Sequence, residues 1–282
     1  MNQNGPKEMG FRTNSRYLNL NRDFLKADSR EIRAFQRLFA EFKPHIFVDT
    51  HVTDGADYSY AMTYLINETE DVTPNLHQFI TKKFQPFLET TMKNKGYPLA
   101  PYINLRADDQ LAGGLDYFYC TPRYSTGFAN MFNTISILTE SHMLKTHATR
   151  VKAQLAMLKT VLEKASESAH EIISIKKTAD SLSSNLLTYD IRWQIDPEKV
   201  EKYQFSAYAS QEVYDEISGT KWVKYDPKRP ELLEIPYRRH LKSVKEIDPP
   251  KAYIVPQSWQ EIIDRLKLND VKIKLFEADQ MI

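Results

Sequence analysis

Apolar residues recur with a helical period in three segments of the chain. Residues 30–42 place their apolar positions three and four residues apart, on one stripe of an α-helix. Residues 74–95 predict a second helix, which Pro86 should kink. Residues 148–170 predict a third helix. The apolar positions of this third helix are expected to face the core, namely Val151, Leu155, Leu158, Leu162 and Ala165.

Two short, continuous apolar runs lie between these helices. Segments 45–52 and 134–140 are rich in β-branched and other apolar residues, which is typical of buried parallel strands. The first run directly follows a helix that ends at Lys43-Pro44, so helix and strand form one unit of a layered sheet. The tyrosine-rich stretch 96–132 predicts a long functional loop. This part of the chain therefore indicates an α/β fold with a mixed sheet flanked by helices.

The pattern changes after about residue 185. Apolar and polar residues now alternate, and Tyr, Val and Trp are frequent, as in half-buried antiparallel strands. The segments with this pattern are 187–195, 202–210 and 220–226.

The end of the chain has a third pattern. It predicts a helix over 258–268 between two strands, at 252–256 and 271–276. We therefore expect two regions, residues 1–175 and a smaller β-rich region over 186–282. The boundary is expected near 172–185.

Composition narrows the classes of function. The chain has 38 Lys and Arg residues against 37 Asp and Glu residues, so its net charge of +1 carries no footprint of nucleic-acid binding. Its single cysteine, Cys120, excludes an intrachain disulfide framework and a cysteine-rich zinc module, and we expect it to be structural. No uncharged stretch is long and apolar enough to predict a membrane span. Glycine-rich phosphate-binding motifs are absent.

Three polar clusters stand where functional groups commonly lie. Residues 19–23 contain an Asn-Arg pair, while clusters 49–51 and 139–142 lie at the carboxyl ends of predicted strands. Ligands bind outside the carboxyl ends of strands in open α/β sheets, so His51 and Glu140 should meet at one edge. Zinc prefers imidazole and carboxylate ligands, and a carboxylate nearby can act as a general base. The pattern favours a metal-assisted hydrolytic site over isolated solvated residues.

The same residues resemble a known family. The runs NLNRD, VDTHVTDGADY and GGLDYFYCTPRYSTGFANMFNTISILTESHM resemble the zinc carboxypeptidases of the carboxypeptidase A type. The chain looks most like a divergent bacterial branch with a long C-terminal extension. The resemblance covers about residues 1–150 well and the rest more loosely, and it implies Zn²⁺ as cofactor and a peptide as substrate.

The resemblance implies a role for each matching residue. Asn21 and Arg22 match the pair that binds the terminal carboxylate of the peptide, and His51 matches the zinc ligand that follows a strand. Glu140 matches the general base that activates water. Arg123 and Tyr124 are the candidates for substrate contact, although Tyr124 is equally well explained as a packed aromatic residue of the loop.

The chain also departs from the family pattern. The family binds zinc through a His-x-x-Glu motif upstream of the Asn-Arg pair, and this chain contains no such motif. The arginine that polarises the scissile carbonyl should also lie upstream. We therefore expect an N-terminally truncated chain that begins between the second and third metal ligands, and that binds zinc weakly and is inactive alone. On resemblance, the parent protein would be secreted or periplasmic.

Two other functions fit the same sequence. The chain could be a non-catalytic binding module, with its site residues as relics, or a zinc deacylase of N-acyl amino acids. His142 is expected to be a solvated loop residue or to orient Glu140. Asp116 is a candidate for lining the pocket of the terminal side chain of the substrate. Oligomeric state stays open.

Overall fold

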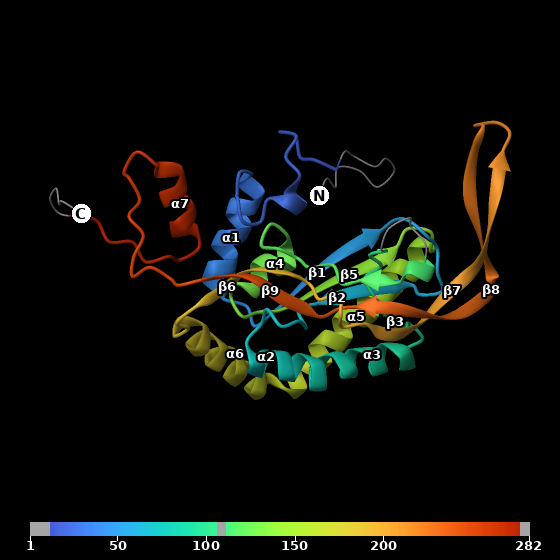
Figure 1. Cartoon of the computed structure of the whole chain (residues 1–282), viewed down its shortest axis with the longest axis horizontal. Coiled ribbons are helices and arrows are strands. Elements are labelled where there is room, and N and C mark those ends of the chain that lie inside the picture. The colour runs from blue at the N-terminus through green and yellow to red at the C-terminus, as the bar shows by residue number, and fades with distance from the viewer. Residues whose placement is uncertain (1–11, 106–110, 277–282) are drawn as a thin grey trace.

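A four-stranded mixed sheet lies at the centre of the computed structural model, which describes residues 12–105 and 111–276 (Figure 1). Its strands are β1 (Ile46–Thr53), β2 (Met62–Ile66), β3 (Leu99–Pro101) and β5 (Ile135–His142). The strand order is β1-β5-β2-β3. Strand β1 runs parallel to β5, whereas β2 runs antiparallel to β5 and parallel to β3. The predicted α/β fold is confirmed, and the two predicted strands are neighbours in it.

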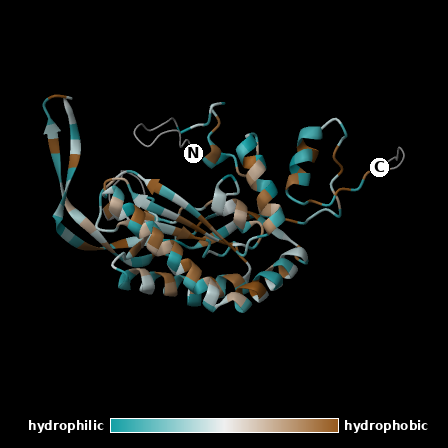
Figure 2. Cartoon of the chain, turned by 180° about the vertical axis from the view of Figure 1, so that it is seen from behind, coloured by the Kyte–Doolittle hydropathy of each residue, from teal (hydrophilic) through white to brown (hydrophobic). Residues whose placement is uncertain are grey.

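Helices cover one face of this sheet (Figure 1). They are α2 (Pro74–Phe79), α3 (Gln85–Asn94), α5 (His147–Glu167) and α6 (Ala169–Ser184). Side chains alternate along a strand, so Ile135 and Ile137 of β5 both point into the core under these helices. Figure 2 shows hydrophobic residues concentrated in the central strands. Within the residues described, no helix is long and apolar enough to cross a bilayer.

The buried face of α5 differs from the predicted one. Ala153, Met157 and Val161 are buried, and they pack toward the sheet and α3. Four of the five positions predicted to be buried are instead 37–67 % exposed, namely Val151, Leu155, Leu158 and Leu162, and the fifth, Ala165, is half-buried. Because α5 carries two apolar stripes, its period alone could not decide which stripe faces the core.

The kink predicted at Pro86 takes the form of a wider turn. The π-helical segment η2 (Ile80–Phe84) joins α2 to α3 and ends just before Gln85-Pro86. Proline has no backbone N–H, and its ring would clash with the carbonyl of the preceding turn of an α-helix. A π turn relieves that clash, so the chain continues as one helical rod.

Two further helices pack beside β1 on the other face of the sheet. Helix α1 (Arg30–Phe42) confirms the helix predicted over 30–42, and α4 (Ser125–Asn130) lies within the predicted long loop. Phe39 of α1 and Phe128 of α4 are buried against each other, with ring centroids 5.4 Å apart. This aromatic contact places α4 directly beside β1.

The C-terminal part of the chain supplies strands that pack on the same face. These are β6 (Tyr189–Ile195), β7 (Glu201–Asp215), β8 (Thr220–Arg238) and β9 (Leu241–Ile247), with the short β4 (Leu115–Asp116) paired to β8. The predicted strands 202–210 and 220–226 fall within β7 and β8, and 187–195 overlaps β6, whereas β9 was not predicted. Phe205 and Ile235 share a core with Leu138 of β5. The distal ends of β7 and β8 project as a two-stranded arm (Figure 1).

The segment predicted as a domain boundary has regular structure. Residues 172–185 form most of α6, which contacts α2 and α5. Ile172 and Ala179 are buried in these contacts. The Ser- and Lys-rich composition of this segment reflects the exposed face of a helix, not a linker.

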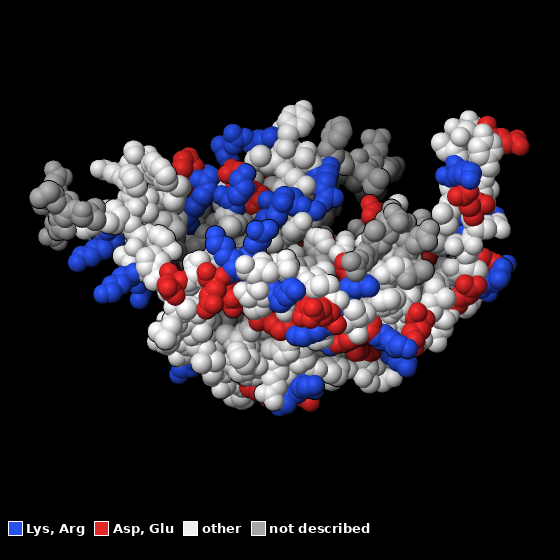
Figure 3. Space-filling view, in the orientation of Figure 1, with Lys and Arg blue, Asp and Glu red and all other residues white. Residues whose placement is uncertain are grey.

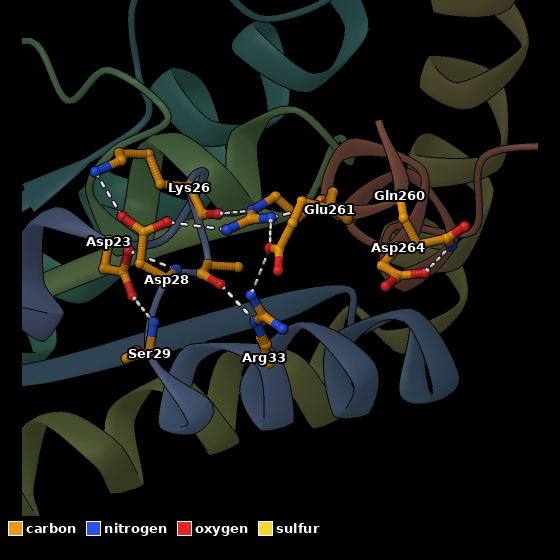
Figure 4. A network of polar contacts seen from close by, with 10 residues as sticks. Asp23, Lys26, Asp28, Ser29, Arg33, Gln260, Glu261 and Asp264 are labelled. Atoms are coloured by element: carbon orange, nitrogen blue, oxygen red, sulfur yellow. Dashed lines mark hydrogen bonds and ion pairs between the residues drawn. The ribbon is translucent and has the colours of Figure 1, made fainter. Parts of the chain in front are cut away.

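Helix α7 (Gln260–Leu268) lies at the end of the described chain, beside α1. Figure 4 shows the polar contacts that join them. Glu261 accepts hydrogen bonds from Arg33 at 3.2 Å and from Arg265 at 2.6 Å, and Arg265 also reaches Asp28 at 3.0 Å. The strands predicted at 252–256 and 271–276 are not formed, because neither segment pairs with another strand within the described part of the chain.

Candidate active site

Strand pairing brings His51 and Glu140 together at one edge of the sheet. In the parallel register of β1 and β5, His51 lies directly opposite Glu140. The His51 Nδ1 atom is 3.9 Å from Glu140 Oε1, and each side chain is only 10 % exposed. The expectation that two strands deliver an imidazole and a carboxylate to the same place is met.

Asp49 orients the imidazole of His51. The two residues are two positions apart in β1, so their side chains share one face of the sheet. His51 Nε2 lies 2.8 Å from Asp49 Oδ2, and the buried hydroxyl of Ser125 donates to the same oxygen at 2.5 Å. Because Nε2 is engaged with Asp49, Nδ1 is the ring nitrogen that faces Glu140.

The electrostatics of this pair favour an ionised Asp49. Burial raises the pKa of Asp49, but hydrogen bonds from His51 and Ser125 outweigh burial and hold that pKa below its usual value. Burial lowers the pKa of His51, whereas the carboxylates of Asp49 and Glu140 raise it, and the net shift is upward. A charged Asp49 is therefore available to hold the ring in one orientation.

Glu140 has a different environment. Burial raises its pKa to about 7, although the positive charge of His51 opposes this shift. Its Oε2 atom is buried and has no hydrogen-bond partner among the residues that the structure describes. A carboxyl group with a pKa near neutrality can both accept and return a proton, which is what general acid–base catalysis requires.

The close approach of α4 makes these contacts possible. A side chain at Gly127 would place its Cβ 2.1 Å from the carbonyl oxygen of Cys120 and 2.2 Å from that of Thr121. Only glycine lets α4 pack this tightly and carry Ser125 to Asp49. Cys120 is buried, and burial raises the pKa of its thiol to about 12, in agreement with the structural role predicted for it.

Arg22 and Tyr124 form a second part of the site. Arg22 ends the short 3₁₀ helix η1 (Leu20–Arg22), where Asn19 Oδ1 accepts the backbone N–H of Asn21 at 3.2 Å. The guanidinium carbon of Arg22 lies 4.4 Å from the centroid of the Tyr124 ring, and that of Arg123 lies 5.6 Å from it. The four residues predicted to bind substrate are thus neighbours in space.

Tyr102 packs near the second part of the site through Phe118. The ring centroids of Tyr102 and Phe118 lie 5.4 Å apart, and those of Phe118 and Tyr124 lie 5.3 Å apart. Burial raises the pKa of Tyr102, the negative charge of Glu140 raises it further, and the positive charge of Arg22 lowers it.

Sequence reasoning missed two residues of the site and misplaced two others. Asp49 could have been found from its spacing to His51, whereas Ser125 has no sequence signal. His142 is neither solvated nor a support for Glu140. It is fully buried, its Nε2 lies 2.8 Å from the carbonyl oxygen of Ala56, and its Nδ1 accepts the N–H of Leu144.

The other misplaced residue is Asp116. Its carboxylate lies 3.7 Å from the guanidinium of Arg238, at the pairing of β4 with β8. This ion pair places Asp116 at the contact of β4 with β8.

The described residues provide only part of a zinc site. His51 offers one free ring nitrogen and Glu140 a carboxyl beside it, but no three His, Cys, Asp or Glu residues within 12–105 and 111–276 group as metal ligands. A catalytic zinc normally has three protein ligands. The residues present therefore fit one ligand and one base of such a site.

Comparison with known proteins gives one likeness. The chain is similar to carboxypeptidase 2 of the fungus Trichophyton rubrum, with 22 % identity over 270 residues. The alignment covers 89 % of this chain and 46 % of the relative, so the chain spans about half the length of that curated protein. No family model and no solved structure matches. This relative is a carboxypeptidase, in line with the resemblance, but it is fungal and not bacterial.

Proposed function

We propose that this chain carries one metal ligand, the general base and the carboxylate clamp of a zinc-dependent, carboxypeptidase-like hydrolase. The observation that carries the proposal is the meeting of His51 and Glu140 across β1 and β5, with Nδ1 facing a carboxyl group of pKa about 7. The similarity to a carboxypeptidase supports the reaction class.

Each residue has a distinct task in this proposal. Zinc, when bound, would polarise the scissile carbonyl and lower the pKa of a water molecule. His51 would hold it through Nδ1, with the Asp49 carboxylate fixing the ring. Glu140 would accept a proton from the attacking water and return it to the leaving amine. Arg22 and Asn21 would bind the free carboxylate at the end of the peptide.

The remaining metal ligands would come from outside the described residues. With His51 as the only ligand in this group, zinc affinity should be low, because each ligand of a catalytic site adds to binding. Calorimetric titration of Zn²⁺ into the chain tests this. We expect a dissociation constant weaker than about micromolar, weakened further by His51→Gln and unchanged by Glu140→Gln.

Two results would contradict the proposal. One-to-one binding tighter than micromolar would show that the chain holds a more complete site than proposed here. Binding that His51→Gln does not affect would remove His51 from the metal site. Exchange of His240 for Gln is the matched control, since that histidine also lies between carboxylates but at the other end of the sheet.

A second candidate function rests on the missing cluster of ligands. Because the described residues hold no group of three metal ligands, a non-catalytic module that binds chain ends through Arg22 is the alternative. A deacylase of N-acyl amino acids would use the same base and clamp. Release of amino acids from peptides, from N-acyl amino acids only, or from neither separates the three functions.

A further inference from the structure

Two guanidinium groups meet on one aromatic ring beside the candidate site. Arg22 and Arg123 lie 4.4 Å and 5.6 Å from the centroid of Tyr124. Neither has a carboxylate within ion-pair distance among the residues of the described chain. Arg22 is half-buried and Arg123 is exposed. Like charges repel, so an anion that binds both guanidinium groups would lower their mutual repulsion.

The nearby carboxylates are already engaged. Asp23 accepts the backbone N–H groups of Asp28 and Ser29, at 3.0 Å and 2.8 Å. Asp49 accepts from His51 and Ser125. Neither of these two carboxylates pairs with Arg22 or Arg123.

Arg22 and the Tyr124 ring are held in place. Arg22 donates from Nη1 to the carbonyl oxygen of Asn21 at 2.7 Å, and Tyr124 packs edge-on against Phe118 at 5.3 Å. The backbone at Arg123 is fixed as well, because its carbonyl accepts the N–H of Phe24 at 3.3 Å. Arg22 and the ring are therefore ordered before any ligand arrives, which lowers the entropic cost of binding.

The surrounding surface is basic. Figure 3 shows Lys and Arg side chains predominating over the upper middle of the molecule, where Figure 1 places α1, α4 and the N-terminal segment. The charge of Arg12 also acts on Glu140, whose pKa burial raises and Arg12 lowers. An anionic ligand would be attracted to this face before it reaches the site.

We infer that the site recognises chain ends with two negative charges, namely a C-terminal glutamate or aspartate. Arg22 binds the terminal α-carboxylate and Arg123 binds the side-chain carboxylate. The Tyr124 ring contacts both guanidinium groups. The inference rests on the proposed function, because it names the substrate class of the same clamp. A single arginine suffices for one carboxylate, so the second arginine accounts for the second charge.

Two ligands that differ in one charge test this inference. N-acetyl-L-glutamate and N-acetyl-L-glutamine have the same shape, and only the first has a side-chain carboxylate. Calorimetry or NMR titration of the chain without zinc at low salt should show glutamate binding about tenfold tighter, the effect of one partly exposed charge-assisted pair. The preference should shrink as salt is added.

Two variants test whether Arg123 causes the preference for N-acetyl-L-glutamate. Arg123→Gln should bring the two ligands to equal affinity, whereas Arg22→Gln should weaken both. Arg37→Gln is the matched control, because it removes the same charge from an exposed position on α1. The comparison of the two ligands on the unmodified chain needs no variant, so a variant that fails to fold does not decide the outcome.

The outcomes separate this inference from the proposed function. Equal binding of both ligands that depends on Arg22 would overturn the inference and leave the clamp standing. A glutamate preference that survives Arg123→Gln would also overturn it. No binding of either ligand, or binding that Arg22→Gln does not change, would overturn the clamp itself.

Discussion

Two histidines in this molecule each lie between two carboxylates, at opposite ends of β2. His51 lies 2.8 Å from Asp49 and 3.9 Å from Glu140. Only the first of these distances is a hydrogen bond. The second ring nitrogen faces a carboxyl group that is itself incompletely paired.

His240 also lies between two carboxylates, but both of its ring nitrogens are within hydrogen-bond distance of a carboxylate oxygen. Its Nδ1 lies 2.9 Å from Glu70 and its Nε2 lies 2.8 Å from Glu201. Glu70 also accepts the N–H of Leu241 at 2.8 Å. This group joins the loop after β2 to β7 and to the turn between β8 and β9, so it fastens the β-rich layer to the central sheet.

The contrast shows what distinguishes a candidate site from a structural contact. Residue types do not, since both groups consist of one imidazole and two carboxyl groups. The two groups differ in the hydrogen bonds that the histidine makes and in how deeply the histidine is buried. Both ring nitrogens of His240 lie within hydrogen-bond distance of a carboxylate, whereas Nδ1 of His51 lies 3.9 Å from Glu140 and has no such partner among the described residues.

The largest expected effect concerns the base. Peptide hydrolysis, in any form of the protein that retains zinc, should fall by about 10²–10⁴-fold on Glu140→Gln, because general-base assistance is lost. Zinc content should not change. Glu201→Gln is the control from the other histidine group and should leave hydrolysis within about twofold. Comparable losses in both variants would erase the distinction between the two groups.

The next effect concerns the packing that supports His51. Gly127→Ala should destabilise the protein by about 1–3 kcal/mol or more, because the added methyl group meets two carbonyl oxygens. Urea denaturation measures this. The same variant should displace the Ser125 hydroxyl from Asp49 and shift the NMR signals of His51 but not those of His240. Unchanged stability would mean that α4 does not need this close approach.

A smaller effect is expected at the second histidine. His240→Gln should lower the free energy of unfolding by about 1 kcal/mol, since it weakens two partly exposed hydrogen bonds. Zinc titration and ligand binding should be unaffected. A loss of ligand binding in this variant would show that the two groups are coupled.

The smallest effect is a pH dependence of stability. Burial lowers the pKa of His240, but Glu70 and Glu201 raise it more, so the folded pKa exceeds the usual value of 6.5. Stability from protonated His240 is present in full below about pH 6.5 and is lost as pH rises through the folded pKa. Arg239 and Glu68 also border this group, with an ion pair at 3.6 Å between them.

Urea midpoints between pH 6 and 9 measure this dependence. The unmodified chain should lose more stability over that range than His240→Gln. An equal loss of stability with pH in the two proteins would show that His240 does not cause the dependence. The contribution of Glu70 to stability depends on pH in the opposite direction. The pKa of Glu70 is held below 4.5, because the N–H of Leu241 and the ring of His240 outweigh burial, so its contribution is lost in acid.

Much of the fold was predictable from local pattern. The helix over 30–42, the strands 45–52 and 134–140, and the alternating segments after residue 185 follow periods of 3.6 and 2 residues, which depend on near neighbours. Where local pattern allowed two answers, prediction failed. The buried stripe of α5 and the helix across 172–185 were both decided by the surfaces packed against them.

The candidate site was also predictable only in part. His51, Glu140 and the Asn21-Arg22 pair were candidates by residue type and position, and the carboxypeptidase resemblance implied their roles. Parallel pairing of β1 with β5 then brought two of them face to face. The orientation of His51 depends on Ser125, which is 76 residues from Asp49 in sequence and carries no pattern of its own.

Sequence alone predicted most of the helices and central strands and named candidate site residues, because period, composition and strand-end position are local properties. Packing settled the rest. It determined which strand lies beside which, how closely α4 approaches residues 120–121, and which of two similar histidines has hydrogen-bond partners at both ring nitrogens. These outcomes depend on contacts between segments far apart in the chain, whose energies no local pattern contains.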